Sequence, residues 1–143
     1  MRRFGVEYID RLLTGKEYGQ LAELSSIICG SPRFSRNVID YGLPPIAFTF
    51  VEALCWFAQA IRSGVWKYYE AIPLPRQEAM SKALRRLAPA GYAEWYERGM
   101  AIWDDEEKIS AVDNWIEGND IEAQKWLRQL AAANRDEILA VTA

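Results

Sequence analysis

The stretch FVEALCWFAQAIRSGVWKYYEAIP, residues 50–73, decides the fold of this chain. It continues an apolar run over residues 46–61, which is interrupted by Thr49, Glu52 and Gln59 and falls short of the roughly 20 residues that a membrane span needs. A helix that is apolar on nearly every face is buried. The sequence therefore predicts a central buried helix over residues 46–63, followed by Gly64 with a positive φ.

One narrow stripe of this predicted helix is polar or aromatic. Thr49, Glu52, Trp56, Gln59 and Ser63 recur at helical spacing and share one face. Burial of a polar group without a partner costs about 2–7 kcal/mol, so we expect Glu52 and Gln59 to be hydrogen-bonded within the fold. The alternative is that Glu52 and Gln59 line a central groove, where they bind a small ligand or take part in catalysis.

Helix signals continue on both sides of this stretch, whereas the alternation of strands and the turns of hairpins are missing. A capping box at residues 14–17 predicts a helix to Cys29, and residues 30–45 have the composition of a loop. Further helices are predicted over residues 65–71, 76–89, 91–103, 105–117, 120–133 and 135–141, with a turn between Pro73 and Pro75. The sequence thus predicts an all-α, compact single-domain bundle, residues 1–143, of about eight or nine short helices around the central helix 46–63.

The composition argues against most kinds of catalytic site and metal site. The 143 residues include no histidine, and both cysteines, Cys29 and Cys55, lie in apolar runs that predict buried thiols. Phosphate-binding glycine loops are missing, and residues 113–124 do not form a calcium loop because Trp115 and Gln124 stand at ligand positions. We therefore expect no enzymatic activity, no cofactor and no metal site. The short, polar N-terminus and the two thiols favour a cytoplasmic protein.

The charge of the chain is unevenly distributed. Residues 1–93 hold 12 basic and 8 acidic residues, whereas residues 94–143 hold 5 and 12, so the two parts carry net charges of +4 and −7. In the predicted helix after Asp104, Ile109, Val112 and Ile116 share one face and should pack inward, which turns the acidic residues toward solvent. The candidate partner-binding residues are all acidic: Asp104, Glu106, Asp113, Glu117, Asp120 and Glu122. The alternative is that these acids only improve solubility.

A basic segment also lies on the predicted helix 76–89. Its residues are Arg76, Lys82, Arg85 and Arg86. The segment is short, and the net charge of the chain is −3, which argues against direct binding to nucleic acid.

The order of several features resembles a known family. The long predicted helix ends in SGVW at residues 63–66, two tyrosines follow, and the next helix ends in ALRRLAPAGYAEWYERG. Trp115, an acidic helix and a terminal ANRDEIL complete the pattern. Over residues 52–139 the chain is similar to the bacterial DNA-mimic protein family, small all-helical proteins whose marker is a long helix that ends in Asn-Gly-Gly-Phe. Ser63 and Val65 replace the Asn and the second Gly of that marker.

The resemblance implies an acidic surface that imitates the charge of duplex DNA and occupies DNA-binding proteins. An immunity protein that neutralises a toxin such as a nuclease would use the same kind of surface, and the sequence does not separate the two. We therefore predict a non-catalytic protein-binding inhibitor, whose acidic C-terminal half contacts a basic protein partner, without direct contact to nucleic acid or membrane. The oligomeric state, a homodimer included, stays open.

Overall fold

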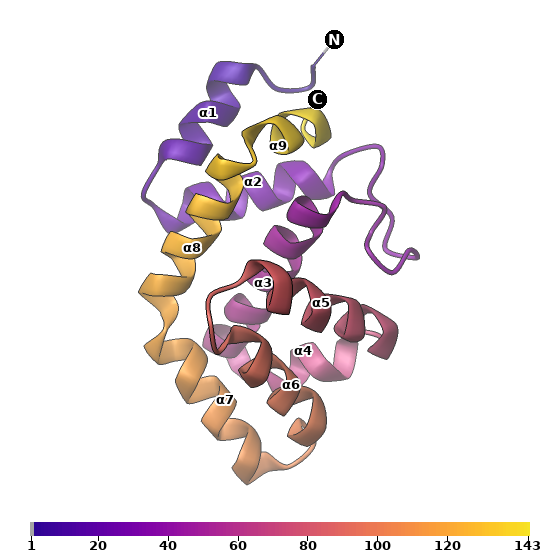
Figure 1. Cartoon of the computed structure of the whole chain (residues 1–143), viewed down its shortest axis with the longest axis vertical. Coiled ribbons are helices and arrows are strands. Elements are labelled where there is room, and N and C mark those ends of the chain that lie inside the picture. The colour runs from indigo at the N-terminus through magenta and orange to yellow at the C-terminus, as the bar shows by residue number, and fades with distance from the viewer. Residues whose placement is uncertain (1) are drawn as a thin grey trace. The chain divides into compact units, whose positions relative to one another are not determined.

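The computed structural model describes residues 2–143, and within this range every regular element is an α-helix (Figure 1). This confirms the all-α fold class. The described chain divides into two compact units, one built from the residues up to Val51 together with Ala123–Ala143, the other from Glu52–Glu122. The single domain expected from the length therefore stays a prediction.

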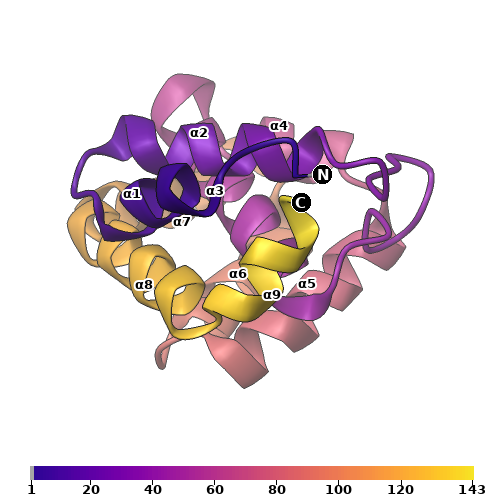
Figure 2. The same ribbon diagram turned by 90° about the horizontal axis from the view of Figure 1, so that it is seen from above.

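The first unit is built from the two ends of the chain. It contains α1 (Val6–Thr14), α2 (Tyr18–Cys29), α9 (Arg135–Val141), the start of α3 (Pro45–Ser63) and most of α8 (Asp120–Ala133). Helix α1 packs against α2, and the C-terminal end lies close to the N-terminal segment in both views (Figures 1 and 2). The core of this unit is aliphatic and includes the buried residues Ile9, Leu24, Ile28, Leu127 and Ile138.

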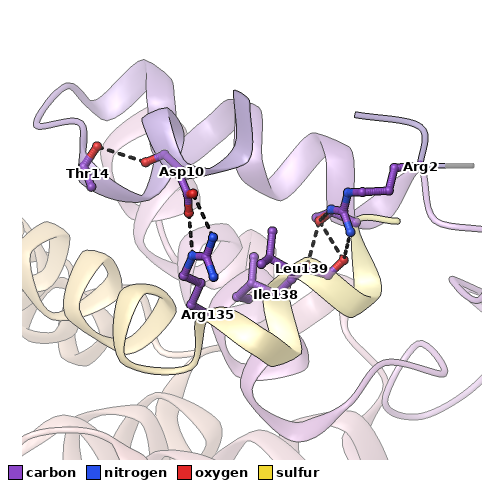
Figure 3. A network of polar contacts seen from close by, with 7 residues as sticks. Arg2, Asp10, Thr14, Arg135, Ile138 and Leu139 are labelled. Carbon is purple, nitrogen blue, oxygen red and sulfur yellow. Dashed lines mark hydrogen bonds and ion pairs between the residues drawn. The ribbon is translucent and has the colours of Figure 1, made fainter. Parts of the chain in front are cut away.

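Arginines fasten the two ends of the chain to each other (Figure 3). Arg2 donates hydrogen bonds to the carbonyl oxygen of Leu139 at 2.8 Å and to the hydroxyl of Thr142 at 3.1 Å. Arg135 meets both carboxylate oxygens of Asp10 at 2.7 and 2.8 Å, a bidentate geometry that fixes orientation as well as distance. The Arg2 contact also suits the negative end of the α9 dipole.

The capping box predicted at residues 14–17 is wrong. Thr14 is the last residue of α1, and its hydroxyl donates to the carbonyl oxygen of Asp10 at 2.9 Å. The box is formed instead by Glu17 and Gln20, which cap α2 reciprocally. The pattern misleads because Thr14 already belongs to α1, a helix that was not predicted. The end of α2 at Cys29 and the loop before Pro45 are as predicted.

Helix α3 confirms the predicted central helix, and in its first three turns the polar residues are buried along with the apolar ones. Thr49, Glu52 and Trp56 are completely buried. Cys55 is exposed, so the prediction of a buried Cys55 thiol is wrong. Ile61, near the end of the helix, is also exposed, at 56%. Cys29 is only half-buried. No helix within residues 2–143 combines the length and apolarity that crossing a membrane requires.

The second unit surrounds the C-terminal part of α3 with four further helices. They are α4 (Trp66–Ala71), α5 (Leu74–Leu87), α6 (Tyr92–Ile102) and α7 (Glu106–Gly118), and α6 packs against the other three. The turn predicted between Pro73 and Pro75 is instead the start of α5, because Pro73 is its N-cap and proline is tolerated in a first helical turn. The core of this unit is rich in tyrosine and tryptophan.

Candidate functional site

Glu52 lies at the centre of a buried tyrosine cluster in the second unit. The Tyr68 hydroxyl donates to Glu52 Oε2 at 2.5 Å and lies 2.8 Å from the Tyr96 hydroxyl. Burial raises the pKa of Tyr68 well above its usual range, and Tyr96 and Glu52 raise it further, so Tyr68 remains a protonated donor. The expectation that Glu52 is hydrogen-bonded inside the fold is thus confirmed.

Gln59 has a separate, local role. Its amide Nε2 donates to the Ser63 hydroxyl at 2.6 Å, one turn further along α3, and the side chain is half-buried. The groove alternative required one cavity that opens onto Glu52 and Gln59. The two hollows described below are lined by other residues, and Glu52 itself has no exposed surface.

The larger hollow, about 700 Å³, lies between α5 and α6. Ser81 donates to Glu97 Oε2 at 2.5 Å, and Arg85 donates to both oxygens of the same carboxylate at 2.7 and 2.8 Å. These hydrogen bonds, from Arg85 first, hold the pKa of Glu97 below its usual range. Glu97 is therefore a neutralised anion and a poor proton acceptor for Ser81.

Helix α7 presents the acidic surface that the sequence predicts. Asp105 caps it, and Asp105 Oδ1 accepts hydrogen bonds from the backbone N–H groups of Glu107 and Lys108, both at 3.1 Å. The apolar side chains pack inward as expected: Ile109, Val112 and Ile116 are buried. Burial of this face leaves the opposite one to solvent.

The six predicted partner-binding residues all lie in the second unit, but they are not equivalent. Asp104, Glu106 and Glu117 are exposed, and none of them forms an ion pair within residues 2–143. Asp120 is half-buried at the first position of α8, and Glu122 is exposed one position beyond Ile121. Both Asp120 and Glu122 have contacts within the fold.

Asp113 differs from the other acids because it has a structural contact. Its Oδ1 accepts the backbone N–H of Val65, the N-cap of α4, at 2.8 Å. Burial raises the pKa of Asp113 above its usual range, the Val65 N–H opposes this, and the charge of Glu117 adds to it. Asp113 therefore joins α7 to the start of α4, a role that its position on the predicted acidic stripe did not reveal.

A second hollow, of about 560 Å³, brings acids and aromatic rings together. We call it the α7 hollow. Its walls include the two tryptophans Trp66 and Trp103 and the three acids Asp104, Glu106 and Asp113. Trp66 is 37% exposed and Trp103 is half-buried, so solvent reaches both indole rings. The sequence signalled each group separately but not that the two share one hollow.

Comparison with protein-family models, with curated proteins and with solved structures finds no match for this chain. Within residues 2–143 no three Asp, Glu or Cys side chains converge in a way that would hold a metal ion. The distinctive chemistry of the second unit is thus the combination of unneutralised carboxylates and accessible indole rings along α7.

Proposed function

We propose that this protein is a non-catalytic inhibitor that binds a basic protein partner through the outward face of α7 together with Asp104, which immediately precedes the N-cap of that helix. The observation that carries the proposal is the exposure of Asp104, Glu106 and Glu117, none of which is neutralised by a cation within residues 2–143. Two acids elsewhere, Asp10 and Glu97, are by contrast paired with Arg135 and Arg85. Asp113 and Glu117 lie four residues apart on α7, and like charges at that spacing destabilise a helix slightly, so this pair has a cost that a basic partner would remove.

Charge density bears on the kind of partner. Glu106 and Glu117 are eleven residues apart, which is about 16 Å along a helix. Even with Asp113 between them, neighbouring carboxylates of the row are on average about 8 Å apart along the helix, whereas duplex DNA carries one charge per roughly 1.7 Å of its axis. The row is thus sparser than a phosphate backbone. This favours a partner that contacts a few separate carboxylates over a partner that requires the full charge density of a DNA duplex.

Two kinds of basic partner fit the proposal. One is a DNA-binding protein, which is what the resemblance to the DNA-mimic family implies. The other is a basic toxin such as a nuclease, which the protein would neutralise as an immunity protein. In either case complementary charge raises the association rate and the specificity of binding, and salt weakens both.

The test is capture of partners from cells of the source organism at low and at moderate salt. The wild-type bait is compared with the triple variant Asp104→Asn, Glu106→Gln, Glu117→Gln, which keeps side-chain size and leaves the Asp113 contact intact. We expect a basic protein on the wild-type bait, with at least about fivefold less on the triple variant at low salt and a smaller difference at higher salt. Mass spectrometry of the captured protein then distinguishes a DNA-binding protein from a toxin.

The control removes the same number of charges elsewhere on the surface. Glu7→Gln, Glu70→Gln and Asp136→Asn change exposed acids that lie outside α7. This control variant should retain the partner nearly as well as the wild-type protein. Equal capture by all three baits would leave the α7 acids with a role in solubility alone.

A further inference from the structure

The α7 hollow places indole rings and carboxylates on the same walls. Trp66 and Trp103 offer ring surface that solvent reaches, and Asp104 and Glu106 are exposed beside them. At about 560 Å³ the hollow has the size of sites that enclose small ligands, which run from about 300 to 1,000 Å³. It is therefore large enough for one long side chain together with part of its backbone.

The wall that carries Trp66 is held in place by the backbone around it. Gly64 has φ of 103°, and a Cβ at this position would lie 3.0 Å from Trp66 Cδ1. The absence of a side chain at Gly64 thus lets the indole lie against the chain. The next residue, Val65, is fixed to α7 through the Asp113 contact. The ring and the acidic helix are therefore held in one arrangement, which lowers the entropic cost of binding.

The electrostatics of the hollow favour a cation. The start of α7 carries about half a positive charge from its backbone. Lys108 adds a full positive charge, and its Nζ lies 4.0 Å from Asp105 Oδ2. Four consecutive carboxylates at residues 104–107 and the nearby Asp113 outweigh these two charges and that of Lys67 beside Trp66. A cation also suits the rings, since Lys67 Nζ already lies 5.6 Å from the centroid of the Trp66 ring, within the range of a cation–π contact.

We propose that the α7 hollow receives one arginine side chain of the basic partner. A guanidinium group stacks flat on an indole and donates paired hydrogen bonds to a carboxylate, so it uses both kinds of wall at once. The ammonium group of a lysine is a compact point charge, so it can pair with a carboxylate but does not stack on a ring. Trp66 and Trp103 would supply the ring surface, and Asp104 and Glu106 the acceptors. This inference rests on the proposed function, because it names the group that the acidic face recognises.

The test uses three synthetic pentapeptides that differ only in the central residue: arginine, lysine or citrulline, which has the shape of arginine without its charge. Binding is followed by NMR through the indole N–H signals of Trp66 and Trp103. We expect the arginine peptide to shift both signals with an affinity in the millimolar range, the lysine peptide to bind several-fold more weakly, and the citrulline peptide not to bind. Free arginine amide shows whether the guanidinium alone suffices; binding as tight as that of the peptide would mean that the hollow takes a small cation and not a partner's side chain.

Matched variants locate the binding. Glu106→Gln and Glu117→Gln remove the same charge from the same helix, but only Glu106 lines the hollow. Glu106→Gln should weaken the arginine peptide about three- to tenfold, and Glu117→Gln less than twofold. Trp66→Leu should abolish the preference for arginine over lysine, and Lys67→Gln should strengthen binding because it removes a competing cation.

The outcomes separate this inference from the proposed function. Equal weakening by Glu106→Gln and Glu117→Gln, with no preference among the charged peptides, would overturn the arginine site and leave a diffuse acidic surface intact. Absence of any indole shift with the arginine peptide would also overturn it. The proposed function fails only if the triple variant Asp104→Asn, Glu106→Gln, Glu117→Gln captures the partner as well as the wild-type protein does. That capture experiment is a separate measurement.

Discussion

Replacement of Glu52 with alanine should lower the free energy of unfolding by about 2–4 kcal/mol. The side chain is completely buried, and its carboxylate accepts the Tyr68 hydroxyl at 2.5 Å. Alanine removes that acceptor and leaves a space beside two hydroxyl groups, those of Tyr68 and Tyr96, that solvent does not reach. Urea denaturation followed by circular dichroism measures the loss.

Glu52→Gln is the matched variant. It keeps the volume of the side chain and one oxygen that accepts from Tyr68, so its loss should be clearly smaller than that of alanine. If Glu52→Ala unfolds at the same urea concentration as the wild-type protein but no longer binds the captured partner, Glu52 is a binding residue and its structural role is refuted. That result would revive the alternative of a central groove.

Gly99→Ala should destabilise the second unit by about 2–3 kcal/mol, although alanine normally favours a helix. A Cβ at position 99 would lie 2.2 Å from the Tyr69 hydroxyl oxygen and 2.3 Å from the ring carbon that carries it. Tyr69 cannot easily move away, because it is 2% exposed and its hydroxyl donates to the Tyr96 carbonyl oxygen at 2.9 Å. The same urea titration measures the change.

The control is the same substitution at a glycine with free space. A Cβ at Gly118, the last residue of α7, would meet nothing within 4 Å. Gly118→Ala should therefore be neutral or stabilising by up to about 0.5 kcal/mol. Losses of equal size at Gly99 and Gly118 would mean that the close approach of Tyr69 does not decide the outcome at Gly99.

The helices that carry a strong apolar pattern were predictable, and so was the positive φ of Gly64. The predicted inward face of α7, with Ile109, Val112 and Ile116, is also confirmed, because three apolar residues at helical spacing have one way to be buried. Helix α1 was not predicted. The signal was present, because Ile9, Leu12 and Leu13 lie at helical spacing and are buried on one face of α1, but Thr14 was interpreted as the start of the next helix.

The candidate site was predictable only in part. Periodicity along α3 places Glu52 on one face with Thr49 and Trp56, but it does not show that the hydroxyl of Tyr68 donates to its carboxylate. Likewise Trp66 and Glu106 are forty residues apart, and only packing in the second unit brings them to one hollow. The contact between Asp113 and the Val65 N–H is of the same kind, because it joins helices that the sequence describes one at a time.

Carboxylate labelling in the presence and absence of the captured partner tests the central claim most directly. A water-soluble carbodiimide couples glycine amide to accessible Asp and Glu side chains, and mass spectrometry measures the extent at each residue. The account predicts that the partner protects Asp104, Glu106 and Glu117, while Glu7 and Glu70, which are exposed acids away from α7, react as before. Unchanged labelling of Asp104, Glu106 and Glu117 in the saturated complex would contradict the claim that this face binds the partner.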